Sequence, residues 1–222
     1  MRAGLATLLP LLWVLSSGAE NTTEGEARAP TDVESLMEFF AASGNVRARF
    51  WESRHISILT DPVETSGMLY FAPPDRLARH STRPGRSSVV VNGDRVSFAD
   101  ETGQSSFDMN TSAVARTLVS NLIVVFRGDL ESLRARYVIS FHREEGKKGS
   151  WTLELEPRSR AVRGIIEQVR FTGKGRELAT METLESNGDR TVMTLSNIET
   201  DLAWETPELE RIFFIGPPNT TP

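Results

Sequence analysis

The stretch from Gly67 to Phe98 constrains the fold most, because turn signals cut it into short apolar segments. Pro73-Pro74 separates two of these segments, and proline lacks the N–H that a central strand has to donate. A second break follows at Pro84-Gly85. Asn92-Gly93 then stands between two apolar runs, where a tight hairpin turn is expected. We therefore predict three or four strands of an antiparallel meander in this stretch.

Apolar alternation predicts further strands on both sides of the meander. Before it, the segment Val46 to Leu59 places Val46, Ala48, Phe50, Ile56 and Ile58 on one face, interrupted by Glu52 and Arg54. The segment Asp100 to Asn110 is polar and is predicted to be a loop. The later strands are predicted at Tyr137 to Arg143, Trp151 to Glu156, Ile165 to Thr172, Glu177 to Glu185 and Thr191 to Ile198. Roughly nine or ten strands fit one strongly curved antiparallel sheet.

A first helix is predicted directly before the strands. Thr31-Asp-Val-Glu34 has the form of a capping box, in which Thr31 and Glu34 each accept a backbone N–H of the other. Val33, Leu36, Met37 and Phe40 follow at helical spacing, and Gly44 ends the pattern. We expect an amphipathic helix with one apolar side.

A second helical segment, Ser112 to Phe126, is strongly apolar. Val114, Leu118, Leu122 and Phe126 belong to an apolar surface that covers more than half of its circumference. A helix of this kind has to be covered on most sides. Gly128 ends it, and Asp129 is expected to cap a short further helix through Leu133.

The two ends of the chain differ from this body in composition. Residues 1–19 have a basic start, a short apolar run and the small residues Ser17-Gly18-Ala19, which predict a signal peptide cleaved after Ala19. Residues 20–30 are polar and are expected to be a flexible segment, and 217–222 a disordered tail. One folded domain is thus expected over residues 31–216. Its Trp204 to Ile215 stretch is apolar enough to dock on the body.

Composition excludes several classes of chemistry. The 222 residues carry a net charge of −5, which argues against a general nucleic-acid binder, and contain no cysteine. Thiol chemistry, Cys-based metal sites and lipidation of an N-terminal cysteine are therefore excluded. The three histidines, His55, His80 and His142, are far apart and lack metal-ligand spacing. No metal site and no cofactor are predicted.

Catalytic motifs are also missing from the sequence. No Gly-X-Ser-X-Gly elbow, Ser-X-X-Lys motif or Gly-rich phosphate loop occurs. The carboxylates alternate with apolar residues as they do on solvated strand faces, although a glycosidase pair is defined by geometry and not by spacing. We predict no catalytic residues and no enzymatic activity.

The apolar positions of the strands have two interpretations. They are either the wall of a lipid cavity or an ordinary packed core, and alternation alone does not separate these. The candidate cavity residues are Phe50, Leu69, Phe71, Val91, Phe98, Trp151, Leu153 and Phe171.

After the predicted signal peptide, the chain has a strand that ends in an aromatic residue, a Pro-Asp-Arg-Leu corner, a Pro-Gly turn and an Asn-Gly hairpin. In these features it resembles the LolA-type outer-membrane lipoprotein carriers. The resemblance implies a mostly β fold: a single, strongly curved and unclosed antiparallel half-barrel, with a few helices covering its concave face. Acyl chains lie against that face, and the helices form a lid. Val114, Leu118, Leu122 and Phe126 would then belong to the lid.

The resemblance also implies a location and partners. It predicts a soluble, monomeric periplasmic carrier of an acylated lipoprotein or another lipid, with an inner-membrane donor and an outer-membrane acceptor. In the carriers an arginine before the corner proline latches the lid. Here Pro73 stands at that position, so Arg76 and Arg79 are the candidate latch residues.

Two other functions remain open at this point. A periplasmic regulatory or sensor domain on the same fold would bind a lipid or protein and transfer nothing. An envelope hydrolase would require carboxylates, or serine and histidine, to converge in the cavity.

Overall fold

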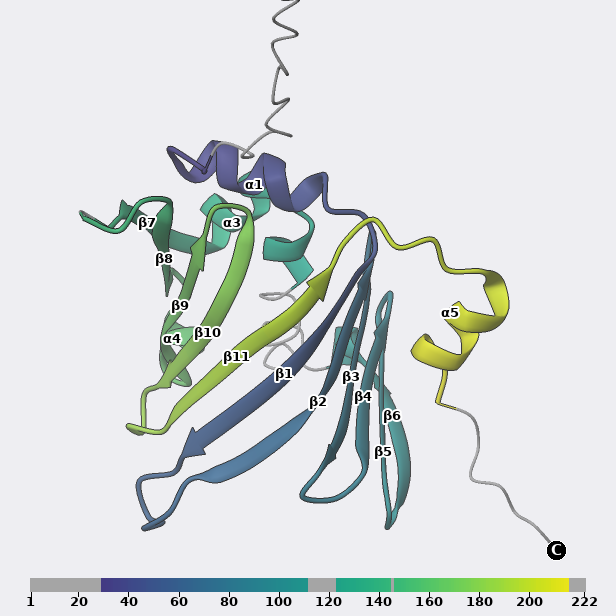
Figure 1. Ribbon diagram of the computed structural model, residues 1–222. Coiled ribbons are helices and arrows are strands. Elements are labelled where there is room, and N and C mark those ends of the chain that lie inside the picture. Colours follow the sequence, from purple (N-terminus) through teal and green to yellow (C-terminus); the bar gives the residue numbers. More distant parts are fainter. Residues whose placement is uncertain (1–28, 112–122, 145, 216–222) are drawn as a thin grey trace, which may run out of the picture.

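The computed structural model of the chain describes residues 29–111, 123–144 and 146–215. Within these residues, one antiparallel sheet of 11 strands dominates the fold (Figure 1). Its strands are β1 (Val46–His55), β2 (Val63–Ala72), β3 (Arg76–Arg83), β4 (Ser87–Asn92), β5 (Arg95–Asp100), β6 (Gly103–Asp108), β7 (Tyr137–Arg143), β8 (Ser150–Pro157), β9 (Ile166–Lys174), β10 (Glu177–Glu185) and β11 (Arg190–Glu199).

The strand order explains how one chain makes an unclosed sheet. The order is β6-β5-β4-β3-β2-β1-β11-β10-β9-β8-β7, so two meanders meet where β1 pairs with β11. The described strands β6 and β7 are the two edges and do not pair with each other. The sheet curves strongly between these edges (Figure 1), which confirms the predicted half-barrel.

The helices are short and lie at different places on this sheet. Helix α1 (Val33–Ala41) and α3 (Leu130–Arg136) lie at the inner, concave face, together with a helical turn at Ile123–Phe126. Helix α4 (Arg160–Arg163) precedes β9, and η1 (Met109–Thr111) follows β6. Helix α5 (Thr206–Phe213) packs on the outer face. No helix of the described residues is long and apolar enough to cross a membrane.

The predicted meander is confirmed, and its turns fall at the predicted breaks. Pro73-Pro74 lies between β2 and β3, and Pro84 lies between β3 and β4. Asn92 ends β4 and Gly93 has a φ of 59°, a left-handed value that glycine adopts without strain. Asp129 caps α3 as predicted, because its side chain accepts the N–H of Ser132 at 3.0 Å.

Three local predictions are wrong. The strand predicted from Val46 to Leu59 ends at His55, and Ile58 is 88% exposed and does not share the inner face. The capping box of α1 is formed by Asp32 and Ser35 and not by Thr31 and Glu34: Asp32 accepts the Ser35 N–H at 2.8 Å, and the Ser35 hydroxyl accepts the Asp32 N–H at 3.2 Å. Threonine and aspartate are both good N-cap residues, so the helix can begin one residue later and still have a capped N-terminus.

The segment predicted as a polar loop, Asp100 to Asn110, instead forms strand β6 and η1. The Asp100 carboxylate accepts the N–H groups of Thr102 and Gly103 and so turns the chain back onto β5. As an edge strand, β6 is held by backbone pairing while nearly all of its side chains are exposed. It therefore lacks the alternation that reveals other strands, and the described sheet exceeds the predicted strand number.

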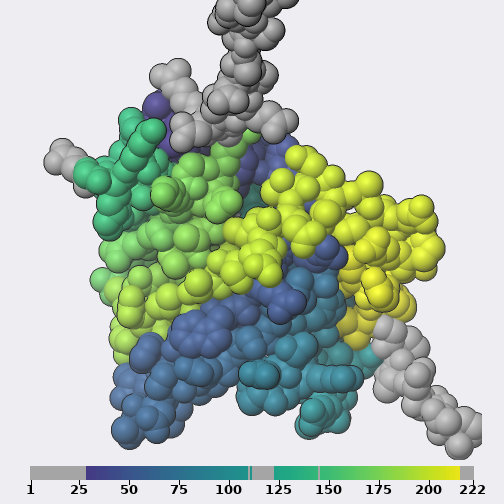
Figure 2. All heavy atoms as spheres, in the orientation of Figure 1, coloured from purple at the N-terminus to yellow at the C-terminus, as the bar shows by residue number. Residues whose placement is uncertain are grey.

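A second, smaller apolar cluster lies on the outer face. Ile212 and Phe213 of α5 pack on Ala72, Ala78 and Val90, whose side chains point away from the inner face. His80 joins this contact through a hydrogen bond of its Nε2 to the Ile212 carbonyl at 2.9 Å. The predicted docking of the C-terminal stretch is confirmed. Figure 2 shows α5 (yellow) against one side of the continuous surface made by the strands.

The sheet can carry a large aromatic residue on β8 because β9 has glycine opposite it. Trp151 is 1% exposed and is paired with Gly173, and its indole N–H donates to the Gly175 carbonyl at 3.0 Å. A Cβ at position 173 would overlap the indole ring and the Glu177 carbonyl.

We expect Gly173→Ala to lower the free energy of unfolding by about 2 kcal/mol or more, because either the indole or the backbone of β10 has to move. Urea unfolding followed by circular dichroism measures this loss. Gly164→Ala is the matched control, since a Cβ there meets only ordinary contacts; its effect should stay within about 0.5 kcal/mol. Equal stability of both variants would contradict the packing described here.

Candidate lipid-binding site

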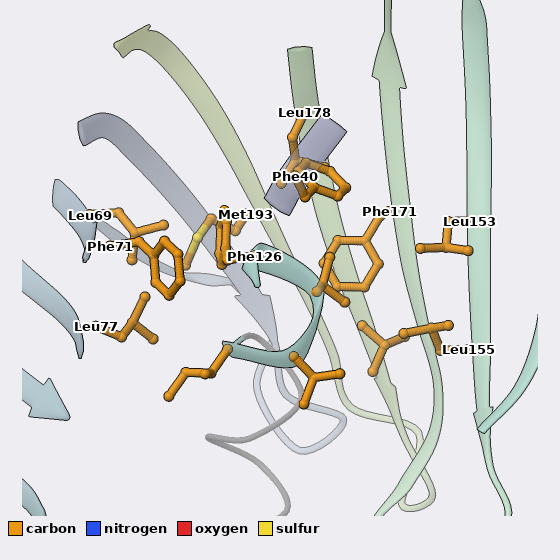
Figure 3. Packing of buried hydrophobic residues seen from close by; sticks show 14 of the residues in the cluster. Phe40, Leu69, Phe71, Leu77, Phe126, Leu153, Leu155, Phe171, Leu178 and Met193 are labelled. Atoms are coloured by element: carbon orange, nitrogen blue, oxygen red, sulfur yellow. The ribbon is translucent and has the colours of Figure 1, made fainter. Parts of the chain in front are cut away.

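The inner face of the sheet is apolar, and helices fill it. Strands from both halves of the half-barrel contribute side chains, and the helical turn at Ile123–Phe126 lies between them (Figure 3). Phe126 stacks on Phe71 of β2 with ring centroids 5.4 Å apart. Phe40 of α1 meets Phe126 and Trp151 edge-on, at 6.4 and 6.2 Å. These three aromatic contacts occupy the middle of the half-barrel.

The helices of the inner face are tied to each other. Gly128 has a φ of 64°, and a Cβ there would overlap the Met37 carbonyl and Ala41, so the chain after Phe126 passes directly against α1. Arg134 of α3 forms an ion pair with Glu34 of α1. Helix α1 and the segment from Ile123 to α3 therefore contact each other as one cover.

Among the described residues, polar contacts hold this cover at the end of α3 and just after α1, where the Asp201 N–H donates to the Ser43 carbonyl at 3.0 Å. The Arg158 side chain donates to the Tyr137 carbonyl at 2.9 Å and to the Arg134 carbonyl at 3.1 Å, which holds the end of α3. Within the described residues, no hydrogen bond joins α1 or Ile123–Phe126 to a strand. In the structure they are attached to the strands by side-chain packing, and the hydrophobic effect behind it has no directional requirement.

A small apolar pocket remains under the C-terminal end of α1. Its volume is about 30 Å³, well below the roughly 300 Å³ of sites that enclose a whole small molecule. Helix α1 contributes Phe39 and Phe40, and Phe126 forms another part of the wall. The sheet contributes Val46, Ala48, Leu69, Phe71, Leu178, Leu195 and Ile198. Phe40 and Phe126 both border the little space that remains.

Seven of the eight residues predicted to line a cavity lie in this inner cluster. Phe50, Leu69, Phe71, Val91, Trp151, Leu153 and Phe171 are each at most 6% exposed. Phe98 is different: it is 37% exposed and stacks on Phe107 of the edge strand, at 5.8 Å. Their roles in ligand binding stay predictions.

Of the predicted lid residues, only Phe126 is described, and it is 7% exposed at the centre of the cluster. Val114, Leu118 and Leu122 lie outside the described residues.

The two candidate latch arginines point to opposite faces of β3. Arg76 alternates with Leu77 and shares the outer face with Ala78, away from the cover. Arg79 is on the inner face, where its guanidinium lies 4.5 Å from the centre of the Phe50 ring.

The described partners of Arg79 are on strands. Its Nη2 donates to Glu52 Oε1 at 2.8 Å and its Nη1 to the Ser81 hydroxyl at 3.0 Å. Its Nε is buried and has no hydrogen-bond partner among the described residues. Glu52 is one of the two polar residues that interrupt the apolar alternation of β1, and its partner in the structure is Arg79. The latch assignment of Arg79 stays a prediction.

Comparison of the sequence with known protein families identifies one family. The sequence profile described as outer membrane lipoprotein carrier protein, LolA-like, matches residues 25–211. The chain belongs to this family. An outer-membrane lipoprotein carrier protein of Methylococcus capsulatus is 23% identical over 212 residues, which cover 95% of this chain and 92% of the relative.

Comparison with solved structures finds several weak similarities in backbone structure. A LolA superfamily protein from Nitrosomonas europaea is 10% identical with a TM-score of 0.45, covering 84% of this chain and 99% of that one. An outer membrane lipoprotein-sorting protein domain from Vibrio parahaemolyticus is 8% identical with a TM-score of 0.46, covering 81% and 95%. The MucA/MucB complex of Pseudomonas aeruginosa is 13% identical with a TM-score of 0.45, covering 80% and 60%. Nothing about function follows from scores this low.

The candidate site residues of the sequence analysis did not include two residues that line this pocket, Phe40 and Arg176. The helical spacing of Leu36, Met37 and Phe40 predicts that Phe40 lies on the buried side of α1. The spacing does not predict where α1 lies in the half-barrel. Arg176, which lines the pocket from the turn between β9 and β10, had no sequence signal. Among the described residues, no group of three or more His, Asp or Glu side chains is arranged to hold a metal ion.

The Arg79–Glu52 pair gives the site a testable polar feature. The two side chains are 23% and 18% exposed, so removal of one leaves the other as a largely buried charge without its partner. We expect Glu52→Leu to lower the free energy of unfolding by about 2 kcal/mol. The double variant Glu52→Leu/Arg79→Leu should recover much of this loss in urea unfolding.

The more exposed Arg47–Glu199 pair, at 35% and 47%, is the control for this cycle. Its coupling energy should lie between about 0 and 1 kcal/mol. Additive losses at Glu52 and Arg79 would show that the two charges do not depend on each other.

Proposed function

We propose that this protein is a periplasmic carrier that shields the acyl chain of a lipoprotein or another lipid between its helical cover and its sheet. One observation supports this most: α1 and Ile123–Phe126 cover the apolar inner face without a described hydrogen bond to any strand. An acyl chain makes the same kind of contact. It can therefore take the place of Phe40 and Phe126 on the sheet.

The energetics favour exchange over permanent binding. Each methylene that leaves water contributes about 0.8 kcal/mol, so a long acyl chain gains on the order of 10 kcal/mol when it is covered. Opening the closed form exposes the aromatic side chains of the cover and opposes this gain. The difference between the two terms sets the affinity, and a small difference allows the lipid to be passed on.

The remaining parts of the proposal follow the family. Residues 1–19 direct export and are cleaved after Ala19, and residues 31–216 form the lipid-binding domain. The protein acts as a monomer without a cofactor and performs no catalysis. Its partners are the acylated cargo, a donor at the inner membrane and an acceptor at the outer membrane.

The test is lipid uptake by the chain purified without detergent, followed by native mass spectrometry. The proposal predicts one lipid or lipopeptide per chain, which moves to acceptor vesicles on mixing. A stable lipid complex that never transfers would favour a lipid-responsive regulatory domain instead. The absence of any uptake from offered phospholipid and lipopeptide would overturn the proposal.

Two substitutions should change lipid affinity in opposite directions. Ala48 is 1% exposed and lines the pocket, so Ala48→Leu fills the space that an acyl chain needs and should weaken lipid binding by roughly tenfold. Phe40→Ala removes a side chain that the lipid has to displace and should tighten binding by roughly tenfold. It should also cost about 3–5 kcal/mol of stability. Titration with a fluorescent fatty acid measures both dissociation constants.

Ala179→Leu is the matched control for Ala48→Leu, because Ala179 is exposed on β10 and lines no part of the pocket. It should leave the dissociation constant unchanged. If Ala48→Leu folds normally and still binds as tightly as the native chain, the acyl chain does not enter this pocket.

A further inference from the structure

The pocket under α1 has a single charged residue in its lining, as far as the described residues show. That residue is Arg176, and the only other polar side chains of the lining are Ser43 and Thr200. All remaining lining residues are apolar. Ligand sites are commonly built in this way, with a largely apolar wall and a few polar groups that fix the orientation of the ligand.

Arg176 is held at the edge of the pocket by an aromatic side chain. It lies in the turn between β9 and β10, beside α1 (Figure 1), and its guanidinium is 5.3 Å from the centre of the Phe39 ring. A cation over an aromatic face is attracted by the ring and keeps its N–H groups available for other partners.

Within the described chain, no carboxylate pairs with Arg176. The described ion pairs involve other arginines, such as Arg170 with Glu154 and Arg190 with Glu182. The carboxylate of Asp201 is close to the same end of α1, but it lies against Gly44 and does not line the pocket. The pocket therefore has a cationic mouth.

We infer that Arg176 binds the anionic head of the lipid whose acyl chain enters this pocket. The inference rests on the proposed function and adds the class of ligand: an amphiphile with a negative group directly next to its acyl chain. The apolar wall receives the chain, and the guanidinium pairs with the phosphate or carboxylate. Arg176 is exposed in the structure, and a bound lipid that covers its guanidinium would make this charge-assisted hydrogen bond stronger than in open water.

The experiment compares two lipids that have the same acyl chain and different head groups. Lysophosphatidylglycerol is anionic and monoacylglycerol is uncharged, and each is titrated below the concentration at which it aggregates against the bound fluorescent fatty acid. The native chain should bind the anionic lipid roughly tenfold more tightly. Arg176→Gln should remove this preference and leave the affinity for the uncharged lipid unchanged. High salt should reduce the preference of the native chain.

Arg160→Gln is the matched control, because it removes the same charge from an exposed site in α4. Arg160 precedes β9 and Arg176 follows it, so the nine-residue strand separates them by roughly 30 Å. The control should keep the head-group preference. If Arg160→Gln abolishes the preference as well, overall charge and not the pocket mouth is responsible, and the inference is wrong.

Two further outcomes separate this inference from the proposed function. If the native chain binds both lipids equally and Arg176→Gln changes neither, the carrier function stands and the role of Arg176 is overturned. If neither lipid binds, both fail. Inorganic phosphate alone should not displace the fluorescent fatty acid; displacement by phosphate would reveal an anion site independent of the acyl chain and would contradict the inference.

Discussion

The fold depends on covering the inner face of a single curved sheet, because the part of the chain that the structure describes contains no second sheet to pack against it. Apolar residues from both meanders converge on this face, and they have to be buried for the domain to be stable. Phe40 and Phe126 provide the central part of the cover. The same two side chains occupy the place of the proposed ligand. Under the proposed function, the stability of the empty protein and its affinity for lipid would compete for one surface.

Polar contacts hold the sheet and the elements that flank the cover. The Trp151 indole is fixed to the β9–β10 turn, Arg158 holds the end of α3, and His80 joins α5 to the outer face. Asp189, buried beside β1, accepts the Ser57 N–H at 2.9 Å, and this hydrogen bond lowers the pKa of its carboxyl. Directional bonds thus fix the sheet, while α1 contacts the strands through non-directional packing. Under the proposed function, the cover would move without unfolding the sheet.

Sequence patterns predicted the frame better than the site. Proline corners and the Asn92-Gly93 turn fix where strands end, because few backbone conformations suit them, and these breaks are confirmed. Strand β6 was missed because both of its faces are largely exposed, which leaves no period to detect. The capping register of α1 was misplaced because Thr31 and Asp32 are both suitable caps.

The site itself depends on contacts between distant segments. The contacts of Phe40 with Trp151 and of Arg176 with Phe39 join segments that are far apart in the sequence. They depend on how the two meanders come together, and no local spacing of residues predicts them. Alternation marked Phe171 and Leu153 as buried, yet it did not show whether they face a cavity or a packed helix. The structure shows helices in that space, and in the proposed function a lipid displaces them.

Hydrogen–deuterium exchange with and without bound lipid shows whether an acyl chain displaces α1 from the sheet. Saturation with an acyl lipid should speed exchange of the α1 amides from Leu36 to Ala41, because the helix leaves the sheet. Amides of β9 and β10 should keep their protection. Unchanged or slower exchange throughout α1 in the lipid complex would contradict the account, since the lipid would then bind without displacing the cover.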